Sequence, residues 1–222
     1  MDIFFHVYLK SGYSRILLDK FKKFQKSGLY EKANKIYLTL FGDDIGLHSE
    51  FLNELKEVYP KIEYAVILNQ EFNNEADTLN FMLKKASEYE SDTPMLYLHT
   101  KGVSYANPFI KKNIDAWVRY LDLYVIKKWE ECVKAVETND AAGPFYTGGN
   151  CLGQHFQGNF WWANSSYLKT LPKIDRQNYN KYNRGEFWVL SETEKVYPLS
   201  DISPVDLYQN YYCKEEDFPD GW

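Results

Sequence analysis

Short apolar runs alternate with segments of helical period through the first hundred residues, and this alternation is the strongest constraint on the fold. The apolar runs are residues 3–9, 36–41, 62–68 and 95–99. Between the first two, Leu17, Phe21 and Phe24 recur at the three- and four-residue spacing of one helix face. Strands that alternate with helices favour a parallel or mixed sheet covered by helices on both faces. We therefore expect an α/β fold.

The same patterns predict the remaining elements. Helices are expected at 51–58 and 76–89, followed by one long helix at about 108–136 and a fifth strand at 141–146. A chain of 222 residues falls in the range where one α/β domain is the leading option, and no linker divides it.

Charge and cysteine content exclude several classes of protein. A net charge of −5 argues against a nucleic-acid-binding protein, whose surface would be basic. The three cysteines are widely separated and lack metal-ligand spacing, which favours a reducing compartment over a disulfide framework or a zinc site. No apolar stretch approaches the ~20 residues of a transmembrane helix. We expect a soluble, unprocessed, cytoplasmic protein.

The fourth apolar run ends abruptly in His99-Thr100-Lys101-Gly102. α/β enzymes place reactive groups where a buried parallel strand ends at its carboxyl edge. We expect His99 and Lys101 at the mouth of a crevice. The alternative is that these residues only begin a solvated loop.

A second polar and aromatic segment covers residues 154–164 and contains the adjacent pair Trp161 and Trp162. Two neighbouring side chains of a strand point to opposite faces, so both indoles cannot enter one core. We expect one of them to meet a ligand or a covering loop, with Asn159 beside it to bond hydroxyl groups. The alternative is a strand buried on both faces.

Several short motifs together resemble a known family. They are EADTL at 75–79, YLHTKG at 97–102, DAAG at 140–143, GNFWWA at 158–163 and RGEFW at 184–188. In this order they are similar to a group of GT-A-type glycosyltransferases found in bacteria and in large DNA viruses of algae. The resemblance implies a GT-A fold with a mixed, mostly parallel sheet, and transfer of a sugar from a nucleotide donor. It also suggests a viral or bacterial origin.

The resemblance implies one domain, residues 1–222, with two functional halves. Residues 1–150 would bind the nucleotide sugar, and residues 151–222 would form the acceptor side and a C-terminal cover. A UDP-sugar, UDP-glucose or UDP-rhamnose by resemblance, would donate a hexose or deoxyhexose to a glycan acceptor. Such a domain can also be part of a longer multidomain glycosyltransferase.

Candidate site residues follow from these motifs. Lys101 is expected to contact the donor diphosphate. The exit of the first strand, residues 6–10, is expected to recognise the donor, with Tyr8 stacked on uracil. The expected nucleotide-sugar-binding residues are Tyr8, His99, Thr100, Lys101, Asn159 and Trp161, and the acceptor-side residues are His155, Arg184 and Trp162.

The resemblance implies that Glu186 is the catalytic base, because RGEFW is similar to the acidic element beyond the acceptor-side strand of such enzymes. Its apolar neighbours Phe187 and Trp188 would partly desolvate the carboxylate, which makes it a better base near neutrality. The alternative is a surface glutamate paired with Arg184 or Arg176. Asp201 and Asp206 are weaker candidates, and Asp140 fits a turn or a ribose contact.

The sequence does not assign the ligands of a bound metal ion. Many GT-A enzymes hold Mn²⁺ or Mg²⁺ with an Asp-x-Asp pair where this chain has His99-Thr100-Lys101. Glu75 and Asp77 have acidic spacing, but a helix start explains both. A divalent cation is therefore a possible cofactor with no assigned ligands. Two other functions remain: an inactive nucleotide- or glycan-binding module, and a metal-dependent hydrolase built on His99 and His155.

Overall fold

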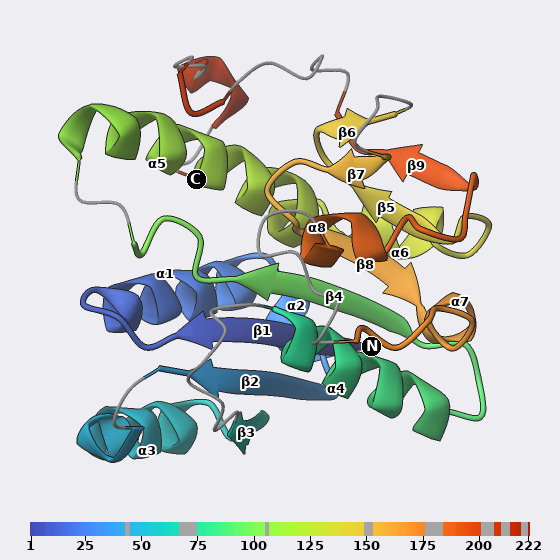
Figure 1. Ribbon diagram of the computed structural model, residues 1–222. Helices are drawn as coiled ribbons and strands as arrows, with labels where there is room; N and C mark the ends of the chain where they lie inside the picture. Colours follow the sequence, from blue (N-terminus) through green and yellow to red (C-terminus); the bar gives the residue numbers. More distant parts are fainter. Residues whose placement is uncertain are drawn as a thin grey trace.

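A seven-stranded, mostly parallel sheet forms the centre of the protein (Figure 1). The computed structural model describes residues 1–42, 45–66, 75–104, 107–148, 153–175, 184–200, 207–209, 214–218 and 222. The strands follow the order β3-β2-β1-β4-β8-β5-β9. They are β1 (Asp2–Tyr8), β2 (Lys35–Phe41), β3 (Ile62–Val66), β4 (Pro94–His99), β5 (Ala141–Gly143), β8 (Trp161–Asn164) and β9 (Val196–Pro198).

Within this sheet, β8 runs antiparallel to both of its neighbours, β4 and β5, and the other pairs are parallel. A second, two-stranded sheet pairs β6 (Tyr146–Thr147) with β7 (His155–Phe156). The expected α/β class and the mixed, mostly parallel sheet are therefore confirmed.

Helices cover both faces of the sheet and bury a separate core on each. On one face lie α1 (Tyr13–Lys26), α2 (Leu29–Lys32), α3 (Ser49–Val58), α5 (Pro108–Asp122) and α6 (Trp129–Ala135). On the other lie α4 (Ala76–Glu88), α7 (Ser165–Leu168) and α8 (Arg184–Trp188). Short 3₁₀ turns occupy Ile45–His48 and Glu215–Asp217. Strands buried on both faces explain the continuous apolar runs in the sequence.

The long helix expected at 108–136 is interrupted. A π-helical turn, Leu123–Lys127, follows α5, and α6 begins after Lys128, whose φ of −97° and ψ of 30° are not helical. The extra residue of a π turn shifts the apolar stripe without ending it, so the sequence pattern still reads as one helix. The strand expected at 141–146 is also divided, because Phe145 has a φ of 53°, which an extended strand does not accommodate.

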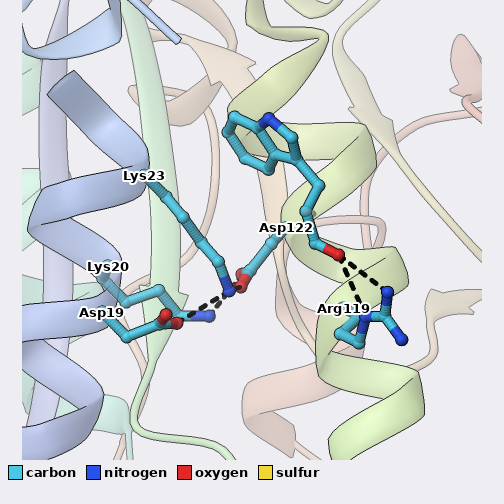
Figure 2. Close-up of polar contacts among 6 residues, drawn as sticks. Asp19, Lys20, Lys23, Arg119 and Asp122 are labelled. Carbon is cyan, nitrogen blue, oxygen red and sulfur yellow. Dashed lines mark hydrogen bonds and ion pairs between the residues drawn. The ribbon is translucent and has the colours of Figure 1, made fainter. Parts of the chain in front are cut away.

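A buried ion-pair cluster joins α1 to the end of α5 (Figure 2). The Asp122 carboxylate accepts from the ammonium groups of Lys20 and Lys23, the latter at 2.8 Å. The side chains of Lys20 and Asp122 are each 1% exposed. Lys23 also contacts the half-exposed Asp19 at 2.7 Å. The cluster links two helices that pack on the same face of the sheet.

No helix in the described part of the chain combines the length and the apolar character needed to cross a bilayer.

Candidate functional site

The sheet reverses its strand order between β1 and β4. From β1 the chain adds β2 and β3 on one side, and then returns to add β4 on the other side of β1. Ligands of open α/β sheets bind at such a switch point, outside the carboxyl ends of the strands. His6 of β1 and His99 of β4 are register partners at this edge.

A cavity of about 330 Å³ opens at this switch point. Its walls come from the ends of β1 and β4, the loop after β4, the start of α4 and one residue near the C-terminus. The lining residues are His6, Tyr8, Glu75, His99, Thr100, Lys101, Gly102, Val103, Ser104 and Tyr208. The prediction that His99 and Lys101 lie at the mouth of a crevice is therefore confirmed.

Among the described residues that line the cavity, Lys101 carries the positive charge. Its Nζ atom lies 3.7 Å from the centre of the Trp117 ring. Burial lowers the pKa of Lys101 to about 8, although the carboxylates of Glu186 and Glu75 oppose this shift. The ammonium form still dominates at pH 7, so an anion in the cavity would meet a desolvated positive charge.

Thr100 connects the ends of the two central strands. Its hydroxyl oxygen accepts a hydrogen bond from the backbone N–H of Tyr8 at 3.0 Å, and its own N–H donates to the carbonyl of His6 at 3.0 Å. The side chain of Thr100 is buried. Tyr8 completes this edge, with its ring centre 5.4 Å from that of Phe41 on β2.

His99 is a neutral imidazole of defined tautomer. Its Nε2 atom lies 3.0 Å from the carbonyl oxygen of Gly158, which can only accept, so Nε2 carries the proton. Burial lowers the pKa of His99 to about 3, and the charges of Lys101 and Lys20 add to the shift. The second ring nitrogen, Nδ1, is therefore an acceptor, and it lies 3.8 Å from Oε1 of Glu75.

His6 is a second neutral imidazole at this edge. Its Nδ1 atom and the Thr78 hydroxyl are hydrogen-bonded at 2.8 Å, and that hydroxyl is 2.6 Å from the hydroxyl of Thr39. Burial lowers the pKa of His6 to about 4. His6 begins the exit of the first strand, residues 6–10, which was expected near the donor, although no individual role was expected for it. Its position near the end of the first apolar run was the signal that it belongs to the site, because the parallel register of β1 and β4 places it beside His99.

Gly158 joins the two sequence motifs. Its carbonyl accepts from His99, and its N–H donates to Oε1 of Glu186 at 2.8 Å. Its φ of 93° is a left-handed conformation that favours glycine. Because β8 is antiparallel to β4, the start of GNFWWA reaches the carboxyl end of β4. The HTKG and GNFWWA motifs therefore meet in one site, and RGEFW joins them through Glu186.

Glu75 and Asn159 close this edge from the side of α4. The Asn159 side-chain amide donates to Oε2 of Glu75, while its oxygen accepts from the Trp161 indole N–H at 2.8 Å. Glu75 precedes α4 without capping it through its side chain. Glu75 therefore does stand at a helix start, as expected, but its carboxylate contacts Asn159 and lines the cavity, and its place in the EADTL motif was the signal for this second role.

The expectation that one indole of the Trp161–Trp162 pair meets a ligand is wrong, because both are completely buried. They point to opposite faces, as adjacent strand residues must, but helices cover each face. Trp161 stacks on Tyr97 with ring centres 5.2 Å apart, and the Trp162 N–H donates to the carbonyl of Val125 at 2.9 Å. The buried-strand alternative is the one observed.

Other candidates lie outside the cavity. The His155 ring packs on Phe187 with centres 4.6 Å apart, and its Nδ1 lies 3.3 Å from the Gly153 carbonyl. Asp140 stands at the amino end of β5, where Thr193 donates to it, so the switch-point edge is out of its reach and a ribose contact is excluded.

Three candidates have no described side-chain geometry. Arg184 begins α8, but its side chain lies outside the described part of the structure, and so do Asp201 and Asp206.

Among the residues that the structure describes, no three His, Cys, Asp or Glu side chains gather closely enough to hold a metal ion. His155 packs on Phe187 and is not among the described residues that line the cavity with His99. At the cavity, Oε1 of Glu75 and Nδ1 of His99 face each other at 3.8 Å.

The fold and site thus define an α/β protein with a polar cavity at the switch point of a mixed sheet. Residues 4–200 match a family described as a domain of unknown function, DUF8361, and the chain belongs to this family. A comparison with curated proteins found no match.

Proposed function

We propose that the protein is a GT-A-type glycosyltransferase that transfers a hexose or deoxyhexose from a UDP-sugar to a glycan hydroxyl. The observation that carries the proposal is the switch-point cavity, in which the Lys101 ammonium stands beside the motif that contains Glu186. The mixed sheet agrees with the fold that the resemblance implies. UDP-glucose and UDP-rhamnose are the first donors to test.

The donor would lie across the carboxyl ends of the strands. Uracil would stack on Tyr8 at the end of β1, and the diphosphate would contact Lys101 after β4. The sugar would then extend toward Gly158 and Glu186 at the start of β8. This order follows from the positions of the strands in the sheet, since β1, β4 and β8 are consecutive neighbours.

Two residues carry the chemistry in this proposal. As the bond to the sugar breaks, negative charge develops on the departing UDP, and the desolvated Lys101 ammonium stabilises it. In an inverting reaction, Glu186 takes the proton of the acceptor hydroxyl. The Gly158 N–H holds Oε1 of Glu186 and fixes the carboxylate, so Oε2 is the oxygen assigned to the acceptor.

A divalent cation fits the cavity only in part. Nucleotide-bound Mg²⁺ needs one or two protein ligands, because phosphate oxygens and water supply the others. Oε1 of Glu75 and Nδ1 of His99, two acceptors 3.8 Å apart, are the described atoms to which it would bind. When bound, it would neutralise phosphate charge. No step of the proposed mechanism depends on it.

Nucleotide binding tests the site. Calorimetric titration of wild-type protein with UDP and with uridine should give tighter binding of UDP. Lys101→Met should weaken UDP by about 10- to 100-fold, the value of one charge-assisted contact, and leave uridine within about threefold. Lys56→Met is the matched control, since this lysine also lies against an aromatic ring, Tyr64 at 5.7 Å. Equal losses for UDP and uridine would contradict a phosphate contact at Lys101.

Turnover tests the reaction. Release of UDP from UDP-glucose or UDP-rhamnose should occur slowly without acceptor and faster with it, with Mn²⁺ present and absent. Glu186→Gln should abolish transfer while UDP affinity stays within about twofold, because the amide keeps the size of the side chain. Retained turnover removes Glu186 from the role of base. Tight UDP binding without any turnover would indicate the inactive binding module instead.

A further inference from the structure

Tyr208 and Trp117 form an aromatic pair beside Lys101. Tyr208 lines the cavity, and its ring meets that of Trp117 edge to face, with centres 5.2 Å apart. The Lys101 Nζ atom lies 3.7 Å from the centre of the Trp117 ring and 5.6 Å from that of Tyr208. The Asn113 side-chain amide of α5 donates to the Tyr208 carbonyl at 2.7 Å, which fixes this residue against the helix.

Tyr208 differs from the other aromatic side chains of the site in its exposure. It is 39% exposed, whereas Trp117 is 5% exposed and Trp161 and Trp162 are completely buried. Among the described residues, the strongly exposed large apolar side chains are Leu18, Leu47, Val58, Phe109, Tyr197 and Tyr208. Of this group, Tyr208 alone lines the cavity. An aromatic face that is open to a ligand cavity and held in place from behind is suited to a flat or apolar ligand surface.

Trp117 provides a second, independent observation. Its indole N–H is buried and has no hydrogen-bond partner within the described structure. Buried donors are nearly always satisfied by protein, solvent or ligand acceptors. With Lys101 against its ring, this donor fits an oxygen-rich ligand beside the ammonium group.

The position of the pair favours the sugar over the nucleobase. Tyr8 lies toward β2, where its ring neighbours Phe41. Trp117 instead borders Gly158, since a Cβ built on this glycine would lie 3.1 Å from the indole ring. Gly158 in turn holds Glu186. The aromatic pair therefore adjoins Lys101 on one side and the junction that holds the proposed base on the other.

We propose that Tyr208 is the surface on which the sugar ring of the donor rests, with the Trp117 N–H donating to an oxygen of the same donor. This inference depends on the proposed function and adds a sugar-binding residue to it. Sugar rings present an apolar C–H face that packs on an aromatic ring. The role that the sequence suggested for the GNFWWA indoles thus passes to a tyrosine about 45 residues further along the chain.

The test compares the binding of uridine, UDP, UDP-glucose and UDP-rhamnose by calorimetry. Wild-type protein should bind at least one of the two sugar nucleotides more tightly than UDP. Tyr208→Ala should weaken that sugar nucleotide by about tenfold or more, UDP by less than threefold, and uridine not at all. Tyr208→Phe should retain most of the affinity because it keeps the ring.

Two further variants control the interpretation. Tyr197→Ala removes an equally exposed tyrosine, 38% against 39%, from β9 and should change no affinity. Trp117→Phe keeps an aromatic ring but removes the N–H, and should weaken the sugar nucleotide severalfold. Because Trp117 is buried, the smaller ring should also lower the melting temperature, and circular dichroism checks that the variant is folded at the temperature of the titration.

The outcomes separate this inference from the proposed function. If wild-type protein binds none of the four compounds, the proposed function itself fails. If it binds them but Tyr208→Ala changes nothing, or weakens uridine, UDP and the sugar nucleotides equally, the sugar contact is overturned and the nucleotide site stands. A wild-type protein that binds neither sugar nucleotide more tightly than UDP also overturns it.

Discussion

Replacing Asp122 with Asn tests whether the buried ion pairs between α1 and α5 organise the protein. The Asp122 carboxylate accepts from Lys20 and Lys23, and the side chains of Lys20 and Asp122 are each 1% exposed (Figure 2). The asparagine keeps the shape of the side chain but leaves the Lys20 cation in the interior without a counter-charge. Removing one partner of a buried pair costs about 3–5 kcal/mol.

This loss is large for the protein and readily measured. The free energy of unfolding of an ordinary domain is about 5–15 kcal/mol, so Asp122→Asn should lower it by about a third. For a chain of this size the melting temperature should fall by roughly 6–20 °C. Urea unfolding at pH 7, followed by circular dichroism, gives the free energy of unfolding for comparison with wild type.

Asp19→Asn is the matched control, because Asp19 contacts the same Lys23 at 2.7 Å but is 51% exposed. An exposed pair one helical turn apart contributes about 0.3–0.5 kcal/mol. The double variant Lys20→Met, Asp122→Asn should recover part of the lost stability, since it removes the unpaired buried charge. Equal losses for Asp122→Asn and Asp19→Asn, or no recovery in the double variant, would show that Asp122 does not stabilise the protein by neutralising the buried Lys20.

The pH dependence of the Asp122→Asn deficit supplies a further check. Burial lowers the pKa of Lys20, and Asp122 opposes that shift. Without Asp122 the folded state holds the Lys20 proton less tightly, while the unfolded state holds it as before. This group therefore makes the variant's stability rise with pH, and the deficit should shrink as the pH rises toward the ordinary pKa of lysine.

Three more predictions use the site. Burial lowers the pKa of His6 to about 4, below its unfolded value, so its contribution to stability is complete above pH 6.5 and is lost as the pH falls toward 4. In wild type this group should reduce the free energy of unfolding by up to about 1.4 kcal/mol per pH unit in that range, and urea unfolding of His6→Gln at pH 5, 6 and 7 should lack this decrease. UDP affinity should fall by up to tenfold per pH unit above about pH 8, where Lys101 loses its proton, and calorimetry of Lys101→Met should show no such fall. Gly158→Ala should cost about 1–3 kcal/mol more than Gly12→Ala in the same unfolding assay, because both glycines have a φ of 93° but only at Gly158 does a Cβ meet an atom, Cδ1 of Leu121, at 2.9 Å. Equal costs for the two glycine variants would show that backbone strain alone matters.

Local pattern was sufficient for much of the architecture. The four strands before residue 100 and the helices between them were predictable because the spacing of apolar residues reports directly on burial. The position of His99 and Lys101 at a crevice was predictable for a related reason. The carboxyl ends of parallel strands share one edge, so a polar run that ends a buried strand must emerge there.

Pairing across the chain was not predictable in this way. The antiparallel insertion of β8 between β4 and β5 brings Gly158 beside His99, and no periodicity within either segment indicates that neighbour. The same insertion covers Trp161 and Trp162 on both faces, so a strand that could have faced a ligand became core. Residues outside the motifs, such as His6, join the site through sheet register.

The fold class, and the edge of the sheet at which polar groups gather, follow from the order of residues alone, because both depend on which side chains of each segment avoid water. Folding is needed to establish which aromatic ring faces the cavity, which carboxylate meets Asn159 and which backbone group holds Glu186. These are contacts between segments far apart in the chain, and their geometry is fixed by how the two cores pack against a common sheet.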